Sequence, residues 1–115
     1  MAQVIDQEAA PLLDEVREIL GLSESELADL FRVRRPSLTA WRAVGIPRAR
    51  RATAERLQAL ARVLDRELIR SRIPEIVRTP DAWLGDRTIL GVLVSDGPDS
   101  VYGYLGRLFA YADGS

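Results

Sequence analysis

The chain has 115 residues, 47% of them hydrophobic and 29% charged, which is typical of a folded globular protein with one or two small domains. It contains no cysteine and no histidine, so disulfides, thiolate nucleophiles and the most common general base are excluded. No apolar run approaches the roughly 20 residues that span a bilayer, and the first ten residues are acidic, unlike a signal peptide. We therefore expect a cytoplasmic protein that is not an enzyme, binds no metal or cofactor, and does not enter membranes.

The net charge of −1 conceals a strongly segregated distribution. Residues 1–30 hold eight acids and one arginine (net −7), residues 31–72 hold twelve arginines and three acids (net +9), and residues 73–115 hold six acids and three arginines (net −3). All 16 basic residues are arginine. A GC-rich genome would account for arginine in place of lysine, but not for the crowding of arginines in the middle of the chain. Guanidinium groups suit the recognition of phosphate and guanine.

Hydrophobic spacing and capping signals predict helices along the whole chain. Apolar residues at helical spacing predict a helix over 11–20, which Gly21 ends. Ser23 and Glu26 form a capping-box pattern, so a second short helix should follow, through Phe31.

The rest of the chain continues the helical pattern. Pro36 should begin a helix that Gly45 closes, and a long amphipathic helix should carry its apolar stripe from Leu57 to Leu68. Residues 88–94 are rich in β-branched side chains, but they have no hairpin partner, so a buried helix is favoured over a strand. A last helix follows over 101–112. The predicted fold is all-α, with residues 1–72 as one domain and residues 73–115 as a second.

The two short helices before Gly45 match a DNA-reading helix-turn-helix. Ala28 provides the small residue where the helices cross, and Leu38 and Trp41 face back toward the core. Thr39 then lies on the outward face of the second helix. Any pair of short helices could give this pattern, but the stretch 32–51 contains seven arginines and no acid, as phosphate neutralisation requires.

Different roles are expected within this arginine cluster. Arg34 and Arg35, at the start of the second short helix, should reach base edges, with Thr39 beside them. The remaining cations of the site should contact phosphates, and these are Arg42, Arg48, Arg50 and Arg51. Since a single recognition helix binds duplex DNA weakly, we expect a homodimer on double-stranded DNA.

The stretch 22–41 resembles the Xre-type helix-turn-helix. The family's packing positions are occupied by Ala28, Val33, Leu38 and Trp41. Arg32 stands where the family often has glycine in the turn, and Glu24 stands where a glutamine commonly touches the DNA backbone. This superfamily implies DNA binding and no more.

The second half is similar to the C-terminal domain of the Xre/MbcA/ParS antitoxins. The resemblance rests on the stretch 83–94, which begins Trp-Leu-Gly-Asp-Arg-Thr, and on Gly97 followed by the last helix from Val101. Ile89 replaces the family's usual proline. The resemblance implies an antitoxin that represses its own operon and covers the active-site entrance of a RES-domain toxin, an enzyme that destroys NAD.

If this resemblance extends to function, the last helix and the tail would contact the toxin. The candidate residues are Tyr104, Arg107, Tyr111, Asp113 and Ser115, since aromatic and arginine side chains are favoured interface anchors. The tyrosines could equally be rim residues over the core. Trp83 is expected in the core.

Two other functions remain open. The chain could be a stand-alone Xre-type repressor whose C-terminal half only dimerises. It could also be a protein–protein adaptor whose helix-turn-helix has lost DNA binding, for which Glu24 and the acidic residues 1–30 argue.

Overall fold

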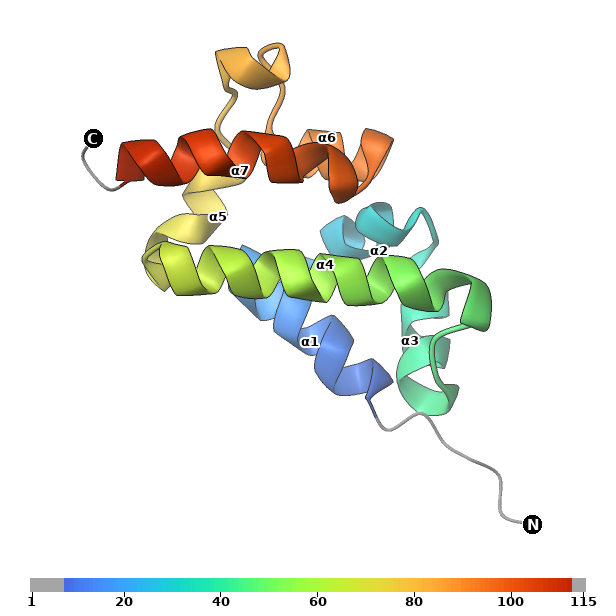
Figure 1. The fold of residues 1–115 in the computed structure, drawn as a ribbon. Helices are drawn as coiled ribbons and strands as arrows, with labels where there is room; N and C mark the ends of the chain where they lie inside the picture. The colour runs from blue at the N-terminus through green and yellow to red at the C-terminus, as the bar shows by residue number, and fades with distance from the viewer. Residues whose placement is uncertain (1–7, 113–115) are drawn as a thin grey trace.

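The chain folds into helices joined by short turns, as a computed structural model shows for residues 8–112 (Figure 1). Within this part the α-helices are α1 (Ala9–Leu20), α2 (Glu24–Phe31), α3 (Arg35–Val44), α4 (Arg48–Glu67), α5 (Ile73–Ile76), α6 (Ile89–Asp96) and α7 (Asp99–Ala112). Two short 3₁₀ turns, η1 (Arg70–Arg72) and η2 (Ala82–Leu84), complete it. The all-α prediction is confirmed. Side chains are described for residues 8–110.

The long helix α4 runs through the middle of the molecule (Figure 1). It packs on α1 along one side and on α7 along another, while α2 and α3 lie toward its N-terminal end. α6 packs on both α2 and α7, so it links the first half of the chain to the last helix. One continuous cluster of buried apolar side chains extends from α1 to α7.

The first two helices form where the local signals place them. Gly21 ends α1 in a left-handed conformation, φ 66°, and its amide donates to the carbonyl oxygens of Arg17 and Glu18. The predicted capping box is present at the start of α2. The Ser23 hydroxyl accepts from the amide of Glu26 at 3.1 Å, and the Glu26 carboxylate accepts from the amide of Ser23 at 2.9 Å.

The predicted packing of the second short helix is also confirmed. In α3, Leu38 is fully buried and Trp41 is 7% exposed. The Trp41 ring meets Phe31 edge-on, with ring centroids 5.4 Å apart, which fixes α3 against the end of α2. The opposite face of α3 is exposed along its length, at Pro36, Thr39, Ala40 and Ala43.

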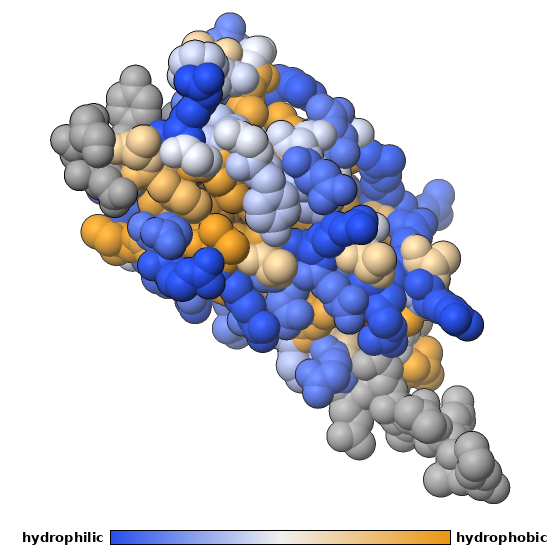
Figure 2. Space-filling view, in the orientation of Figure 1, coloured by the Kyte–Doolittle hydropathy of each residue, from blue (hydrophilic) through white to orange (hydrophobic). Residues whose placement is uncertain are grey.

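Residues 88–94 lie within or just before a helix rather than in a strand, as predicted. Thr88 caps α6 by accepting from the amide of Gly91 at 2.9 Å, and Ile89, Val92 and Leu93 are buried. None of the helices in residues 8–112 has the length and apolar character needed to cross a membrane. Figure 2 shows mostly hydrophilic side chains over the middle of the visible face, with apolar ones toward the end where α7 finishes.

The prediction that Trp83 belongs to the core is wrong, because its side chain is 60% exposed. Trp83 lies in η2, on a loop that projects from the body of the molecule (Figure 1). The Asp81 carboxylate accepts from the amide of Trp83 at 2.8 Å, and Asp81 pairs with Arg87 through their backbones. This closed turn directs the next residue, Leu84, into the core and leaves the indole outside.

Candidate DNA and protein interfaces

The turn between α2 and α3 has helix-turn-helix geometry. Arg32 takes a left-handed conformation, φ 56°, and the amide of Val33 donates to the carbonyl oxygen of Ala28 at 3.1 Å. A left-handed residue at this point explains why glycine suits the position, since a side chain there is strained by its Cβ. Ala28, where the two helices cross, is 3% exposed.

The side chain of Arg32 lies against the C-terminal half instead of pointing into solvent. Its guanidinium donates to the carbonyl oxygens of Val94 at 2.9 Å and Ser95 at 2.6 Å. These carbonyls belong to the last turn of α6, where helix geometry leaves them without a partner in the helix. Arg32 therefore ties the α2–α3 turn to the C-terminal end of α6.

Glu24, at the first position of α2, is paired with Arg42 of α3. The two guanidinium nitrogens of Arg42 donate to the two carboxylate oxygens of Glu24 at 2.9 and 2.7 Å, and Arg42 also reaches Asp14 at 3.1 Å. The bond to Arg42 holds the pKa of Glu24 below its ordinary value, although partial burial opposes the shift. The carboxylate is thus neutralised within the protein, and Arg42 is committed to α1 and α2.

Four of the predicted DNA-contact residues are exposed at neighbouring helix starts or on the outward face. Arg34 is the N-cap of α3, Arg35 is its first residue, and Arg48 is the first residue of α4. In residues 8–112 the side chains of these three arginines make no hydrogen bond or ion pair, although the charge of Arg35 helps to lower the pKa of Glu24. Thr39 lies on the exposed face of α3. Neither α3 nor α4 has an acid in its first turn, so both helix N-termini stay electropositive.

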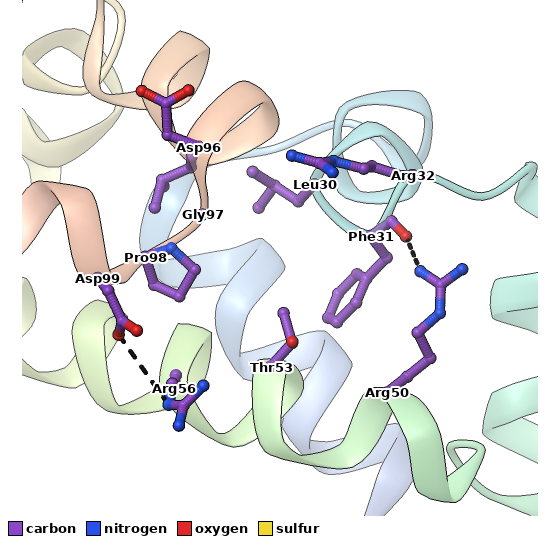
Figure 3. Close-up of a pocket in the computed structure, with 11 residues that line it drawn as sticks. Leu30, Phe31, Arg32, Arg50, Thr53, Arg56, Asp96, Gly97, Pro98 and Asp99 are labelled. Carbon is purple, nitrogen blue, oxygen red and sulfur yellow. Dashed lines mark hydrogen bonds and ion pairs between the residues drawn. The ribbon is translucent and has the colours of Figure 1, made fainter.

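The other two predicted phosphate contacts have partners inside the protein. Arg51 is half-buried, and its guanidinium lies 3.5 Å from the carbonyl oxygen of Ile46. Arg50 donates to the carbonyl oxygen of Phe31, the last residue of α2. Figure 3 shows Arg50 reaching across toward Phe31 at one side of a polar cleft of about 310 Å³.

This polar cleft lies between the end of α2, the start of α4 and the α6–α7 turn (Figure 3). Arg32 and Arg50 line one side of it, and Asp96 and Asp99 line the other. Arg56 reaches Asp99 at 4.0 Å. Three arginines and two aspartates line the cleft, so opposite charges face each other across a polar seam between the helix-turn-helix and the C-terminal half.

Two of the predicted protein-contact residues hold the projecting loop against α7. The Tyr104 hydroxyl donates to Asp81 at 3.0 Å. Burial, and to a smaller extent that hydrogen bond, raises the pKa of Tyr104 to about 12. The guanidinium carbon of Arg107 lies 3.6 Å from the ring centroid of Trp83. Between the loop and α7 is a shallow hollow lined by Pro80, Trp83, Tyr104 and Leu108. Tyr111, Asp113 and Ser115 have no described side chains.

Sequence reasoning missed Trp83 and Asp81 as parts of this surface. The available signal was local: an aspartate two residues before the tryptophan, and Gly85 two residues after it, predict a tight turn. Such a turn is too short to bury a bulky indole and the following leucine on the same side. No cluster of three or more metal-ligating side chains occurs in residues 8–112.

Comparison with known proteins gives a likeness at the level of the fold. Neither a protein-family model nor a curated protein matches the sequence. Among solved structures, the chain is similar to a chain in the crystal structure of the M. tuberculosis MbcT–MbcA toxin–antitoxin complex. The match has a TM-score of 0.65 and 20% sequence identity, and it covers 95% of this chain and 93% of that chain. The shared fold therefore includes both the helix-turn-helix and the C-terminal helices.

Proposed function

We propose that this chain is the antitoxin of a toxin–antitoxin pair, and that it acts by binding and not by catalysis. The observation that carries the proposal is the likeness to a chain of the MbcT–MbcA toxin–antitoxin complex over nearly the full length of both chains. The antitoxin is the member of such a pair that the sequence resemblance over residues 83–111 indicates. Absence of cysteine and histidine from the whole sequence agrees with a binding role.

The partner we propose is a RES-domain toxin that degrades NAD. In this proposal residues 73–115 form the toxin-binding part and cover the entrance to the toxin's active site. The contact residues are on α7 and in the tail that follows it, at Tyr104, Arg107, Tyr111, Asp113 and Ser115. Support comes from the sequence resemblance, together with the exposed position of Arg107 beside the projecting loop.

A co-expression experiment tests the antitoxin role. The chain is expressed with the product of the adjacent gene, and co-purification, host growth and cellular NAD are measured. We expect a stable complex, with NAD lost when this chain is omitted. Absence of both a complex and an effect on NAD would contradict the proposal and leave a stand-alone repressor as the better explanation.

We further propose that the helix-turn-helix of residues 1–72 binds double-stranded DNA as a homodimer and represses the chain's own operon. The supporting observation is the group of exposed arginines, Arg34, Arg35 and Arg48, at two helix N-termini that carry no acid in their first turns. In this proposal Thr39, which is exposed on α3, contacts a base. Arg51 is retained as a phosphate contact.

Arg42 and Arg50 contribute to this proposed DNA interface indirectly. Both donate to groups within the protein, Arg42 to Glu24 and Arg50 to the carbonyl oxygen of Phe31. We assign them the role of holding α3 and α4 in place against α2. Glu24, paired in this way, presents less repulsion to phosphate than a free carboxylate would, which weakens the argument for an adaptor that has lost DNA binding.

Gel shifts with the operator region at several salt concentrations test DNA binding. Affinity that rests on phosphate contacts must fall steeply with salt. Light scattering on the free protein and the complex measures whether a homodimer forms. A chain that binds no duplex at low salt would favour the adaptor function.

A further inference from the structure

The projecting loop of residues 80–88 is held in one conformation by contacts at both of its ends. Asp81 accepts from the Tyr104 hydroxyl at 3.0 Å and from the amide of Trp83 at 2.8 Å. Arg87 donates to Ser95 at 3.1 Å and to Asp96 at 3.2 Å, which anchors the other end of the loop on α6. The loop therefore presents its side chains without having to be ordered on binding, which favours affinity.

On this loop Trp83 is 60% exposed, although tryptophan has the largest side chain and most of its surface is apolar. The guanidinium carbon of Arg107 lies 3.6 Å from the indole centroid, a separation typical of stacked planar groups. Stacking occupies a face of the guanidinium, whereas its N–H donors radiate from the edge. The edge of Arg107 therefore stays available to an acceptor.

Arg107 differs from the other two arginines of the C-terminal half. Arg78 donates to the carbonyl oxygens of Pro74 and Gly21 and to Glu26, and Arg87 donates to the carbonyl oxygen of Leu84 and to Ser95 and Asp96. In residues 8–112 the Arg107 side chain makes no hydrogen bond or ion pair, and its guanidinium stacks on the indole ring. An immobilised guanidinium with all its donors unused is a receptor for a carboxylate, which it can bind through two parallel hydrogen bonds.

We propose that the Trp83–Arg107 stack is the anchor of the partner interface, and that it receives an aspartate or glutamate side chain of the protein partner. The partner's carboxylate binds the edge of Arg107, and an apolar neighbour of that carboxylate covers the exposed face of Trp83. The hollow between the loop and α7, lined by Pro80, Tyr104 and Leu108, accommodates that neighbour. This inference rests on the proposed antitoxin function, because the partner is the toxin named there.

The choice of partner chemistry follows from charge. Arg107 is the only cation of the described part of α7, and the acid that lines the hollow, Asp81, already accepts from the Tyr104 hydroxyl and the Trp83 amide. The unused donors at the anchor are therefore those of Arg107, which attract an acidic partner segment and repel a basic one. Tryptophan and arginine are the residue types most enriched among side chains that dominate binding energy. The Trp83–Arg107 stack places these two residue types side by side on the surface before the partner binds.

The test uses the full chain and the purified toxin encoded beside it, with the dissociation constant measured at several salt concentrations. We expect Arg107→Ala and Trp83→Ala each to weaken binding by about 30-fold. Arg107→Lys should recover only part of the loss, because an ammonium group neither stacks nor forms a two-pronged bond. Arg107→Ala should also reduce the dependence of affinity on salt. The variant that carries both Trp83→Ala and Arg107→Ala should lose less binding free energy than the sum of the two single losses.

Two controls separate binding from folding and from self-association. Arg66→Ala removes an exposed arginine on α4 that is paired with its neighbour Glu67, and it should leave the affinity unchanged. Thermal melts should show that the Trp83 and Arg107 variants stay folded. Tryptophan emission reports the site directly, because the other tryptophan, Trp41, is buried: toxin binding should change the emission of the wild-type chain, but not that of Trp83→Phe.

The outcomes are distinguishable. A wild-type chain that binds the toxin, with both variants within about twofold of it, would overturn the anchor and leave the antitoxin function standing. If the variants break up a homodimer but bind the toxin normally, the anchor is also overturned, because Trp83 would then contact a second copy of the chain and not the toxin. A wild-type chain that binds no toxin would overturn the proposed function and this inference together.

Discussion

Arg42 and Glu24 form a two-pronged ion pair, with nitrogen–oxygen distances of 2.9 and 2.7 Å, that connects the second helix of the helix-turn-helix to the first. Their side chains are 23% and 34% exposed, so the pair is only partly screened by solvent. Asp14 on α1 shares the same guanidinium at 3.1 Å. One arginine thus sets the position of α3 relative to both helices beneath it.

Replacing Arg42 with alanine should destabilise the fold by about 1–3 kcal/mol, because two partly buried carboxylates lose their shared donor. Urea denaturation followed by circular dichroism measures the free energy of unfolding. Arg34→Ala, at an exposed residue just before α3, is the matched control and should change it by no more than about 0.5 kcal/mol. Equal effects of the two substitutions would show that the pair does not hold α3.

The helices could be predicted from the sequence because their signals are local. Ser23 and Glu26, or Gly21 after an apolar stripe, act over three or four residues, and the structure places them as predicted. The partners of the arginines could not be predicted. Arg42 meets Asp14 across 28 positions, and Arg32 meets Val94 across 62 positions, so only the packed fold brings them together. The prediction that Trp83 is buried was wrong for a related reason, since the turn around Asp81 determines the direction in which the indole points.

Gly21→Ala and Gly85→Ala should differ in cost although both glycines have nearly the same backbone, φ 66° and 68°. At Gly85 no atom lies within 4 Å of an added Cβ, so only conformational strain of about 1–2 kcal/mol is expected. At Gly21 the Cβ would lie 2.5 Å from Cγ of Pro74. That clash adds about 1–3 kcal/mol of overpacking.

Denaturant titration of the two glycine variants measures the difference. Because the backbone strain is common to both variants, the additional loss of unfolding free energy in Gly21→Ala reports the contact between the end of α1 and α5. The same loss in the two variants would mean that Pro74 moves aside without cost.

Arg32→Gly should destabilise the chain less than Arg32→Ala does. Both substitutions remove the hydrogen bonds to the carbonyl oxygens of Val94 and Ser95, but glycine also relieves the left-handed strain at φ 56°, by about 1 kcal/mol. Thermal melts of the two variants beside the wild type measure this order. If alanine proved the milder substitution, the turn would not need a left-handed residue.

Tyr104 should ionise well above the ordinary range of tyrosine. Burial and the bond to Asp81 raise the pKa of Tyr104 to about 12. Since the folded-state pKa lies above the ordinary tyrosine value of 10.0, its contribution to stability is fully present below pH 10 and is lost as the pH rises toward 12. An ultraviolet titration of phenolate absorbance should therefore lose a late step in Tyr104→Phe. A late step that survives in this variant would assign the raised pKa elsewhere.

Arg35→Ala and Arg48→Ala should affect DNA binding in different ways, although both remove exposed cations whose side chains make no hydrogen bond or ion pair in residues 8–112. Arg35 begins α3, where a helix-turn-helix reads bases, so its loss should cost about 1–3 kcal/mol on the operator and relax sequence preference. Arg48 begins α4 and should contact phosphate, so its loss should weaken the binding of all duplexes alike. It should also reduce the slope of the logarithm of affinity against the logarithm of salt concentration by about 1.

Competition gel shifts with operator and scrambled duplexes, repeated over a salt series, distinguish these two roles. Arg66→Ala serves as the control for net charge, because Arg66 is an exposed arginine near the far end of α4. Losses that are equal and blind to sequence in Arg35→Ala and Arg48→Ala would mean that both arginines only neutralise phosphate. Recognition would then have to come from Ser37 and Thr39, the uncharged polar side chains of α3, the helix proposed to enter the groove.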